Sequence, residues 1–232
     1  MFDDNLKKNQ ETWDLIAESF DKTRGKPWKQ CIDFINTLKE TNIAIDIGCG
    51  NGRHLIKCAE LCRQAIGLDI SRELLFIARN KLVENKLNNA VFLHSDATNL
   101  PIKDETVDAI IYIASLHNIQ GRDKRIHSLK ELKRILKKDG IALISVWSRW
   151  QDKYRKLFFK KWFIQIDKSE FGDIDIYWRQ NNLNIPRFYH LYSKKEFVED
   201  LKKSGLKIIK IESVKLSSRN YPDNYFATVK KN

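Results

Sequence analysis

The first part of the chain alternates short apolar runs with stretches whose apolar residues recur at helical spacing. The apolar runs have the length of buried strands and are expected at 43–47, 65–69, 90–94, 107–113 and 141–147. The periodic stretches between them predict helices at 53–61, 71–85 and 122–137. This alternation is typical of a parallel, doubly wound sheet, so the sequence predicts an α/β protein with a Rossmann-like fold.

Further elements are expected on both sides of this core. Apolar spacing predicts helices at 6–20, which we expect to cover the mouth of a ligand site, and at 28–38. Near the carboxyl end, the sheet is expected to resume at 187–192, followed by a helix to residue 204 and an antiparallel edge pair at 207–214 and 225–230. We therefore expect a single domain over 1–232. Its parts are the N-terminal helices (1–42), the core (43–148), a basic aromatic insertion (149–184) and the C-terminal sheet edge (185–232).

A glycine turn follows the first expected strand. Gly48, Gly50 and Gly52 come directly after the apolar run that ends at Ile47. Glycine permits a tight turn and a close approach of backbone to a ligand, so strand, turn and helix in this order predict a binding site. The position that would carry the third glycine of a dinucleotide fingerprint is Arg53, which argues against a nicotinamide or flavin cofactor.

Acidic residues stand at the ends of the next two expected strands. Asp69 lies about twenty residues after the turn, where a carboxylate can accept hydrogen bonds from ribose hydroxyls, and Asp96 follows the third strand. With the glycine turn, these residues resemble the class I S-adenosylmethionine-dependent methyltransferases over roughly 43–148. The resemblance implies a seven-stranded sheet and S-adenosylmethionine as cofactor. The residues implied to bind it are Asp46, Gly48, Gly50, Asp69, Ile70, Asp96, Ala97 and Ile113.

Three other segments suggest what is methylated. They are 20–28, which contains Thr-Arg-Gly-Lys-Pro-Trp, 113–118, and 185–192, which contains Arg-Phe-Tyr-His-Leu-Tyr. Together they resemble the tRNA wobble-uridine methyltransferases, which esterify 5-carboxymethyluridine at position 34 to 5-methoxycarbonylmethyluridine. By matching position, the resemblance implies that Arg24, His117 and Arg187 act on the substrate. Asn118 stands where this family usually has a second histidine.

The charge balance is compatible with a polyanionic partner. The chain has 42 basic and 30 acidic side chains, a formal net charge of +12. A lysine-rich composition bias explains the same excess, and composition alone does not separate the two. In the insertion, basic residues alternate with aromatic ones, so Lys153, Arg155, Lys160 and Lys161 are candidate RNA contacts. The alternative is an amphipathic cover helix with solvated lysines.

The cysteines predict neither a disulfide framework nor a metal site. All four lie in the first third of the chain, at positions 31, 49, 58 and 62, without a two-residue spacing. The wobble-uridine family usually works with a small zinc-containing activator subunit docked on the third strand. The resemblance therefore implies such a partner for 90–94, an apolar edge that needs a cover.

Two other functions remain open on the sequence alone. A small-molecule methyltransferase would explain the glycine turn but not the basic aromatic insertion. A catalytically silent, RNA-binding methyltransferase fold would explain the insertion but not the intact Gly48, Gly50, Asp69 and Asp96. No apolar run approaches the roughly 20 residues that span a bilayer, and no signal-peptide pattern opens the chain, so we expect a cytoplasmic protein.

Overall fold

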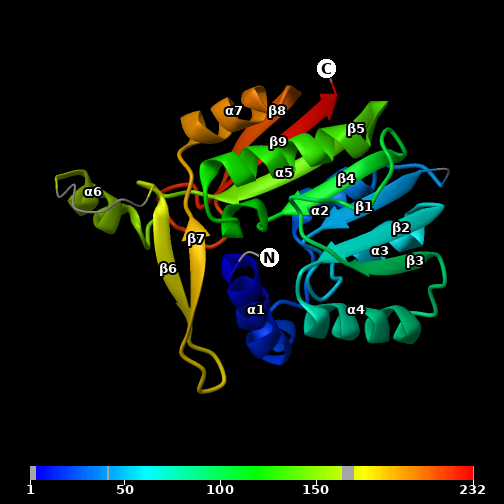
Figure 1. The fold of residues 1–232 in the computed structure, drawn as a ribbon, viewed down its shortest axis with the longest axis horizontal. Coiled ribbons are helices and arrows are strands. Elements are labelled where there is room, and N and C mark those ends of the chain that lie inside the picture. The colour runs from blue at the N-terminus through cyan, green and yellow to red at the C-terminus, as the bar shows by residue number, and fades with distance from the viewer. Residues whose placement is uncertain (1–3, 41, 164–169, 232) are drawn as a thin grey trace.

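The structure is a computed structural model that describes residues 4–40, 42–163 and 170–231 (Figure 1). A seven-stranded sheet runs through it in the order β3-β2-β1-β4-β5-β9-β8. Its strands are β1 (Ile43–Ile47), β2 (Gln64–Asp69), β3 (Ala90–His94), β4 (Val107–Ile113), β5 (Leu136–Trp147), β8 (Leu206–Val214) and β9 (Asn224–Lys231). The predicted α/β fold with a seven-stranded sheet is confirmed.

The first five strands are parallel, and the last two are antiparallel to their neighbours. β1 pairs with β2 on one side and with β4 on the other. The chain therefore adds β2 and β3 on one side of β1 and then crosses over to add β4 and β5 on the other side. In sheets of this kind, ligands bind outside the carboxyl ends of the strands where the chain changes sides in this way. The topology therefore places the glycine turn after β1 at the expected ligand site.

Helices cover both faces of the sheet because its strand residues are apolar on both faces (Figure 1). One face packs against α2 (Lys29–Ile35), α3 (Leu55–Leu61) and α4 (Arg72–Glu84). The opposite face packs against α5 (Arg122–Ile135) and α7 (Lys194–Lys203). Along β4, Ile110 and Tyr112 face the α5 side, whereas Ala109 and Ile111 face the α3 side. Two continuous cores therefore hold the carboxyl ends of the strands in place.

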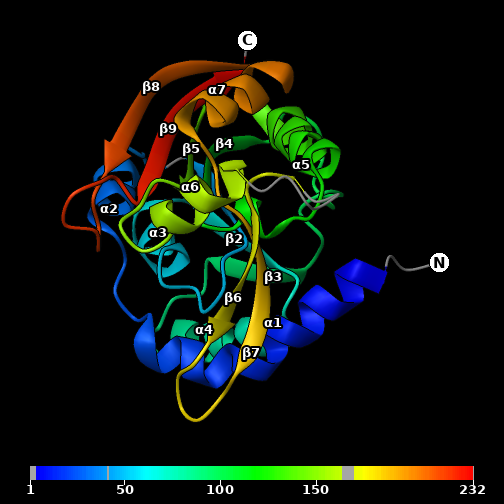
Figure 2. The same ribbon diagram turned by 90° about the vertical axis from the view of Figure 1, so that its left-hand side faces the viewer.

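The first helix, α1 (Asp4–Thr23), packs beside α4 (Figure 2). Asp14 accepts hydrogen bonds from the Ser71 hydroxyl (2.6 Å) and the Glu73 amide (3.2 Å) at the start of α4. Near the other end of α1, Asp21 pairs with Lys81. These contacts fix α1 against the half of the sheet that carries the glycine turn.

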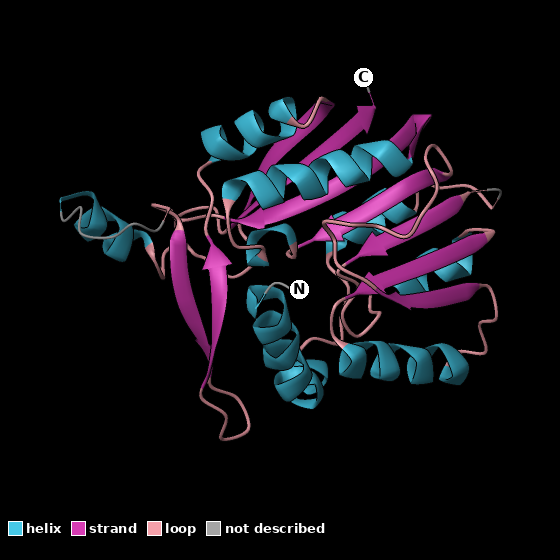
Figure 3. Ribbon diagram, viewed as in Figure 1, coloured by secondary structure: helices cyan, strands magenta, loops and turns pink. Residues whose placement is uncertain are grey.

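The segment 187–192 does not form a strand of the main sheet, so that part of the sequence prediction was wrong; only Tyr192 bridges to Ser148, just beyond the end of β5. β7 (Ile185–His190) instead pairs antiparallel with β6 (Asp173–Trp178) in a separate two-stranded sheet (Figure 3). The position beside β5 is already filled by β9, so β7 has no ladder to join there. A small core of its own supports the hairpin. It consists of Phe158, Ile176, Tyr189 and Leu191.

The insertion contains more regular structure than the sequence predicted. It includes α6 (Arg155–Phe163), which projects away from the main sheet (Figure 1), as well as β6. Residues 164–169 of the insertion lie outside the described part of the chain. A short 3-10 helix over Leu116–Asn118 follows β4 and was not predicted. Among the described helices, none is both long and apolar enough to cross a membrane.

Candidate functional site

A cavity of about 1110 Å³ lies between the main sheet, α1 and the β6–β7 hairpin. Its lining includes the ends of β1, β2 and β4, the loop after β3, and side chains from α1, β6 and β7. Of the predicted cofactor residues, seven line it: Gly48, Gly50, Asp69, Ile70, Asp96, Ala97 and Ile113. Two of the three predicted substrate residues, Arg24 and Arg187, line it as well.

The glycine turn needs glycine for two separate reasons. Gly48 and Gly50 have backbone φ angles of +66° and +53°, which side-chain-bearing residues rarely adopt. At Gly48, a Cβ atom would also lie 2.6 Å from Cβ of Ser115 and closer still to its hydroxyl. The turn is closed onto β2 by the Gly48 amide, which donates to the carbonyl of Leu68 at 2.7 Å. Bare backbone therefore forms this wall of the cavity.

Asp69 is held rigidly at the end of β2. Its carboxylate accepts from the Gly50 amide at 2.7 Å and from the Ser71 amide at 2.8 Å. Burial raises its pKa to about 6, against the lowering effect of these backbone bonds. At neutral pH the group is therefore mainly ionised, with lone pairs still available to a ligand in the cavity.

Asp46 occupies a different environment from the other predicted cofactor residues. It lies in β1, is buried, does not line the cavity, and its Oδ2 has no hydrogen-bond partner among the described residues. Burial and the nearby Asp69 carboxylate raise its pKa to about 8, although Arg53 lowers it. Most Asp46 side chains are thus protonated at neutral pH, and the residue stands behind the glycine turn rather than in front of it.

Asp96 lies in the loop after β3, at the same end of the cavity as Asp69. Its carboxylate accepts from the amide of Thr98 at 2.9 Å and from its hydroxyl at 2.5 Å, which fixes the carboxylate orientation. Ala97 and Ile113 supply apolar wall on either side. Two oriented carboxylates, flat apolar walls and a bare glycine turn fit a purine nucleoside with a tail along the turn.

The opposite end of the cavity is aromatic and positively charged. The guanidinium carbon of Arg187 lies 4.8 Å from the ring centroid of Trp178, 5.0 Å from that of Tyr189 and 5.5 Å from that of Trp13. Arg24 approaches the same Trp178 ring at 5.4 Å. Arg187 donates to the Tyr189 hydroxyl at 2.7 Å, and its Nε has no partner in the described chain. Neither arginine is within 4.0 Å of a carboxylate among the described residues.

His117, the third predicted substrate residue, does not line the cavity. It is fully buried and stacks on Tyr189 at 5.1 Å between ring centroids, and Trp147 stacks on Tyr189 at 4.9 Å. Its Nδ1 accepts from the Trp147 amide at 3.1 Å, and burial lowers its pKa to about 3. The neutral His117 ring lies behind Tyr189 and supports the cavity wall. In this conformation it does not reach a methyl acceptor in the cavity.

Its neighbour Asn118 lines the cavity instead. Its amide nitrogen donates to the carbonyl of Phe188 at 3.1 Å, which joins the 3-10 helix to β7. The residue that departs from the family pattern therefore lines the cavity, whereas the histidine that fits the pattern does not.

The four predicted RNA contacts do not lie in equivalent places. Lys153 and Lys160 are exposed, and Arg155 packs over the Tyr221 ring at 4.4 Å on the outer surface. Lys161 instead lines the cavity and donates to the carbonyl of Asp173 at 2.7 Å. Three of the four cations are thus available to a surface partner, and one belongs to the wall of the site.

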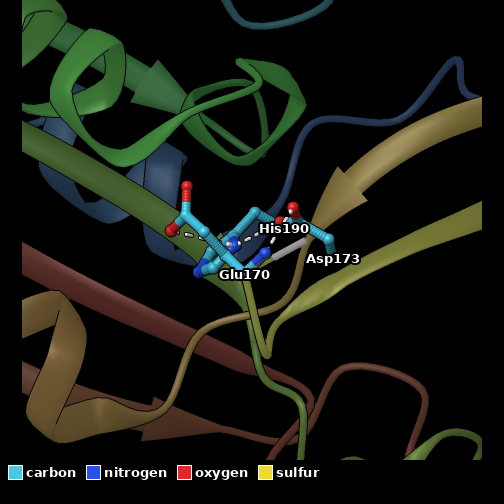
Figure 4. Close-up of side chains that lie close together, drawn as sticks. All are labelled: Glu170, Asp173 and His190. Atoms are coloured by element: carbon cyan, nitrogen blue, oxygen red, sulfur yellow. Dashed lines mark hydrogen bonds and ion pairs between the residues drawn. The ribbon is translucent and has the colours of Figure 1, made fainter. Parts of the chain in front are cut away.

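A cluster of charged groups anchors the hairpin behind the cavity. His190, at the end of β7, bonds Asp173 through Nδ1 at 2.7 Å (Figure 4). Its Nε2 bonds Glu196 at 2.8 Å. Burial lowers the pKa of His190, but these two carboxylates outweigh it, so its pKa is raised. Glu170 lies 3.8 Å from Nδ1 and pairs with Arg125 at 2.6 Å.

The spacing of Glu170, Asp173 and His190 is compatible with a metal ion, since their ligand atoms lie within 4.8 Å of one another. Both ring nitrogens, however, already bond carboxylates, and Glu170 also accepts from the backbone amide of Arg122 at 2.7 Å. A metal would have to displace these bonds and the Arg125 ion pair. The arrangement is better explained as an ion-pair network that holds β6 and β7 to α5 and α7.

Sequence reasoning missed the aromatic residues of the charged end. Trp13 comes from α1, and Trp178 and Tyr189 come from the hairpin, so they are far apart in sequence and meet only in the fold. The Trp178 indole donates to the hydroxyl of Ser19 in α1 at 2.8 Å, which closes the cavity on that side. Tyr189 lies in the segment 185–192 that the sequence analysis singled out, but nothing in the sequence marked Trp13 and Trp178 as its neighbours.

Comparison with known proteins agrees with the chemistry of the cavity. The methyltransferase domain family matches residues 45–144. A Xenopus tropicalis tRNA (carboxymethyluridine(34)-5-O)-methyltransferase is 38% identical over 146 residues, which are 63% of this chain and 22% of the relative. The Schizosaccharomyces pombe protein of the same name is 29% identical over 221 residues, which are 86% and 88% of the two chains. The chain thus spans about a fifth of the length of the first relative and most of the second.

Solved structures agree on the fold. A Methanosarcina mazei S-adenosylmethionine-dependent methyltransferase superposes with a TM-score of 0.74 at 22% identity, covering 89% of this chain and 98% of that one. A Haloferax volcanii putative methyltransferase, solved in complex with the Trm112 methyltransferase activator, superposes at 0.67 with 17% identity, covering 97% and 96%. The predicted resemblance to class I methyltransferases and to the tRNA carboxymethyluridine enzymes is confirmed, and use of S-adenosylmethionine is implied.

Proposed function

We propose that the chain, which resembles methyltransferases in sequence and has the class I fold, methylates the carboxylate of 5-carboxymethyluridine at wobble position 34 of tRNA, yielding 5-methoxycarbonylmethyluridine. The observation that carries the proposal is the pair Arg24 and Arg187, which flank Trp178 in the cavity without a carboxylate partner among the described residues. A planar base with an attached carboxylate matches an aromatic wall with two free cations.

The cofactor proposed for the other end of the cavity is S-adenosylmethionine, which supplies a methyl group on a sulfonium. Asp69 would accept from the ribose hydroxyls and Asp96 from the adenine amino group, with Ile70, Ala97 and Ile113 beside the base. Gly48 and Gly50 leave room along the turn for the methionine part. Asp46 is assigned to supporting the turn from behind, because it does not reach the cavity.

The acceptor carboxylate needs orientation rather than deprotonation. A carboxylate is ionised at neutral pH, so ester formation needs no strong general base. Arg187 lines the cavity and can hold one carboxylate oxygen through its guanidinium, whose Nη1 is fixed by the Tyr189 hydroxyl. Arg24 lies at the exposed rim and can reach the carboxylate or the adjacent phosphate. His117 acts indirectly, by holding Tyr189 and Trp147 in place.

Asp69→Ala should weaken S-adenosylmethionine binding by about 1 to 3 kcal/mol, because two ribose hydroxyls lose a charged acceptor. Titration calorimetry measures the change directly. Asp33→Ala, which removes an exposed carboxylate on α2 that pairs with Lys29, is the matched control and should leave the affinity unchanged. Equal affinities for wild type and the folded Asp69 variant would remove the residue from the cofactor site.

We propose that tRNA binds across α6 and enters the cavity from that side. α6 exposes aromatic residues beside its cations: Phe159 is 65% and Trp162 is 69% exposed. Exposed rings next to Lys156 and Lys160 can stack on unpaired bases of the anticodon loop while the lysines meet phosphates. Lys161 connects this surface with the cavity wall.

Charge reversal of Lys153, Arg155 and Lys160 should reduce tRNA affinity by roughly tenfold or more. It should also make the salt dependence shallower by about one unit of slope for each phosphate that is no longer neutralised. Reversal of Lys202, Lys203 and Lys207, which are exposed near the α7–β8 connection, changes the net charge equally and should have a much smaller effect. Filter binding over a salt series distinguishes the two sets. Identical reductions would mean that only the overall charge matters and that α6 is a structural cover.

A small zinc-containing activator subunit is the proposed protein partner, docked on β3. β3 ends the main sheet, and Val91 on it is 43% exposed. The Phe92 carbonyl on this strand is occupied by the Arg79 guanidinium at 3.2 Å, so an added strand would have to displace that side chain. The Haloferax volcanii neighbour was solved with a methyltransferase activator, which supports a partner of this kind.

The decisive test is methyl transfer to tRNA from cells blocked at this final step, with and without an activator subunit. Mass spectrometry of the digested nucleosides should detect the methyl ester of 5-carboxymethyluridine. Transfer to small molecules but not to this tRNA would favour a small-molecule methyltransferase. Absence of S-adenosylmethionine binding by folded protein would favour a silent RNA-binding subunit.

A further inference from the structure

Three arginines line the cavity, and none has a carboxylate within 4.0 Å among the described residues: Arg24, Arg53 and Arg187. Elsewhere in the described chain, the more buried arginines are paired with acids. These are Arg122, Arg125, Arg134 and Arg149. Arg155, which is half-buried outside the cavity, packs over the Tyr221 ring instead. Arg24 and Arg187 flank Trp178, so Arg53 is the cavity arginine without an assigned role.

Arg53 lies at the end of the glycine turn, directly after Gly52. Its guanidinium carbon is 5.1 Å from the centroid of the Trp28 ring, and its Nη1 donates a long bond of 3.4 Å to the carbonyl of Lys26. Most of its donors are therefore unused within the described chain. The side chain is held by Trp28 at the cavity surface beside the turn that carries Gly48 and Gly50.

The groups that surround Arg53 do not neutralise its charge. The Asp46 carboxyl has a pKa of about 8, mainly because of burial, and is mostly protonated at neutral pH. Burial keeps His54 neutral with a pKa of about 3, and it raises the pKa of the Cys31 thiol well above neutrality. Arg24, the other charged neighbour, is also a cation. A partly buried cation in such surroundings favours binding of an anion.

We propose that Arg53 binds the α-carboxylate of the cofactor's amino-acid end. This inference rests on the proposed use of S-adenosylmethionine. Asp69 contacts the Gly50 amide of the glycine turn, and Arg53 directly follows the turn and lines the same cavity, so its guanidinium can meet an amino-acid tail that runs along the turn. Arg53 thus serves the cofactor, whereas Arg24 and Arg187 remain for the acceptor.

The test compares two ligands that differ in the amino-acid tail. S-adenosylhomocysteine carries the carboxylate, and 5′-methylthioadenosine has the same nucleoside and sulfur without it. Arg53→Gln should weaken S-adenosylhomocysteine binding by about tenfold to a hundredfold, the usual range for a charge-assisted hydrogen bond, and change 5′-methylthioadenosine binding by less than about twofold. Arg53→Lys keeps the charge and should weaken binding less.

Controls separate this role from a structural one. Arg63→Gln, at an exposed position after α3, should leave both affinities unchanged, and circular dichroism should show that every variant is folded. Equal weakening of both ligands by Arg53→Gln would overturn the proposal, and so would a tail-specific loss in Arg24→Gln but not in Arg53→Gln. If folded wild-type protein bound neither ligand, the methyltransferase proposal itself would fail, which is a distinguishable result.

Discussion

Arg187→Ala should lower the efficiency of methyl transfer to tRNA by roughly thirtyfold to a thousandfold, equivalent to about 2 to 4 kcal/mol. The guanidinium belongs to a residue that is 7% exposed and lies among three aromatic rings, so water cannot replace it when an acceptor carboxylate is bound. Arg24→Ala should cost less, because Arg24 is exposed at the rim and water can partly substitute for it.

The measurement is kcat/KM for tRNA that carries 5-carboxymethyluridine, with S-adenosylhomocysteine affinity as the control for the cofactor site. Arg179→Ala removes an exposed arginine from the same hairpin, outside the cavity, and should retain transfer. His117→Ala should reduce transfer less than Arg187→Ala, because it acts only through the placement of Tyr189 and Trp147. Near-wild-type transfer by Arg187→Ala would exclude it from acceptor binding.

The second large effect is expected at the glycine turn. Gly48→Ala must hold a side chain at a φ of +66°, which costs about 1 to 2 kcal/mol, and must fit a Cβ 2.6 Å from that of Ser115, which adds about 1 to 3 kcal/mol of overpacking. The turn must shift to relieve this contact. Cofactor binding should therefore fall below detection even where the protein still folds.

Urea unfolding and calorimetry measure the two consequences separately. Gly25→Ala is the matched control, because a Cβ there would meet nothing within 4 Å and the glycine has no positive φ. Ser115→Gly combined with Gly48→Ala should recover the overpacking part of the stability loss but not the backbone part. Unchanged stability and binding in Gly48→Ala would show that the turn is not constrained as described.

The grouping of the proposed cofactor residues at one edge of the sheet was predictable from sequence because it depends on local patterns. Gly48, Gly50, Asp69 and Asp96 each stand at or just after the end of an apolar strand, and parallel strands bring their carboxyl ends to one edge. The sequence pattern did not reveal which acidic side chains are buried. Asp46 also lies near the end of a strand, but it is buried behind the glycine turn and does not line the cavity.

The acceptor half was only partly predictable because it depends on contacts between distant segments. Arg24 and Arg187 were found through resemblance, but Trp178 joins them only because β6 pairs with β7, and β6 was not expected. His117 was expected to contact the substrate through the same resemblance, whereas packing turns its ring behind Tyr189. The spacing of residues along the sequence does not predict which way a side chain points in a short 3-10 helix.

The separate hairpin sheet has a consequence for how such proteins diversify. The residues proposed to bind the cofactor lie within the region matched by the methyltransferase domain family, 45–144, whereas Trp13, Arg24, Trp178 and Arg187 all lie outside it. The hairpin has its own small core and its own ion-pair anchor. Evolution, or a protein engineer, can therefore exchange the α1 and hairpin segments to recruit a new methyl acceptor while the inherited cofactor half stays intact.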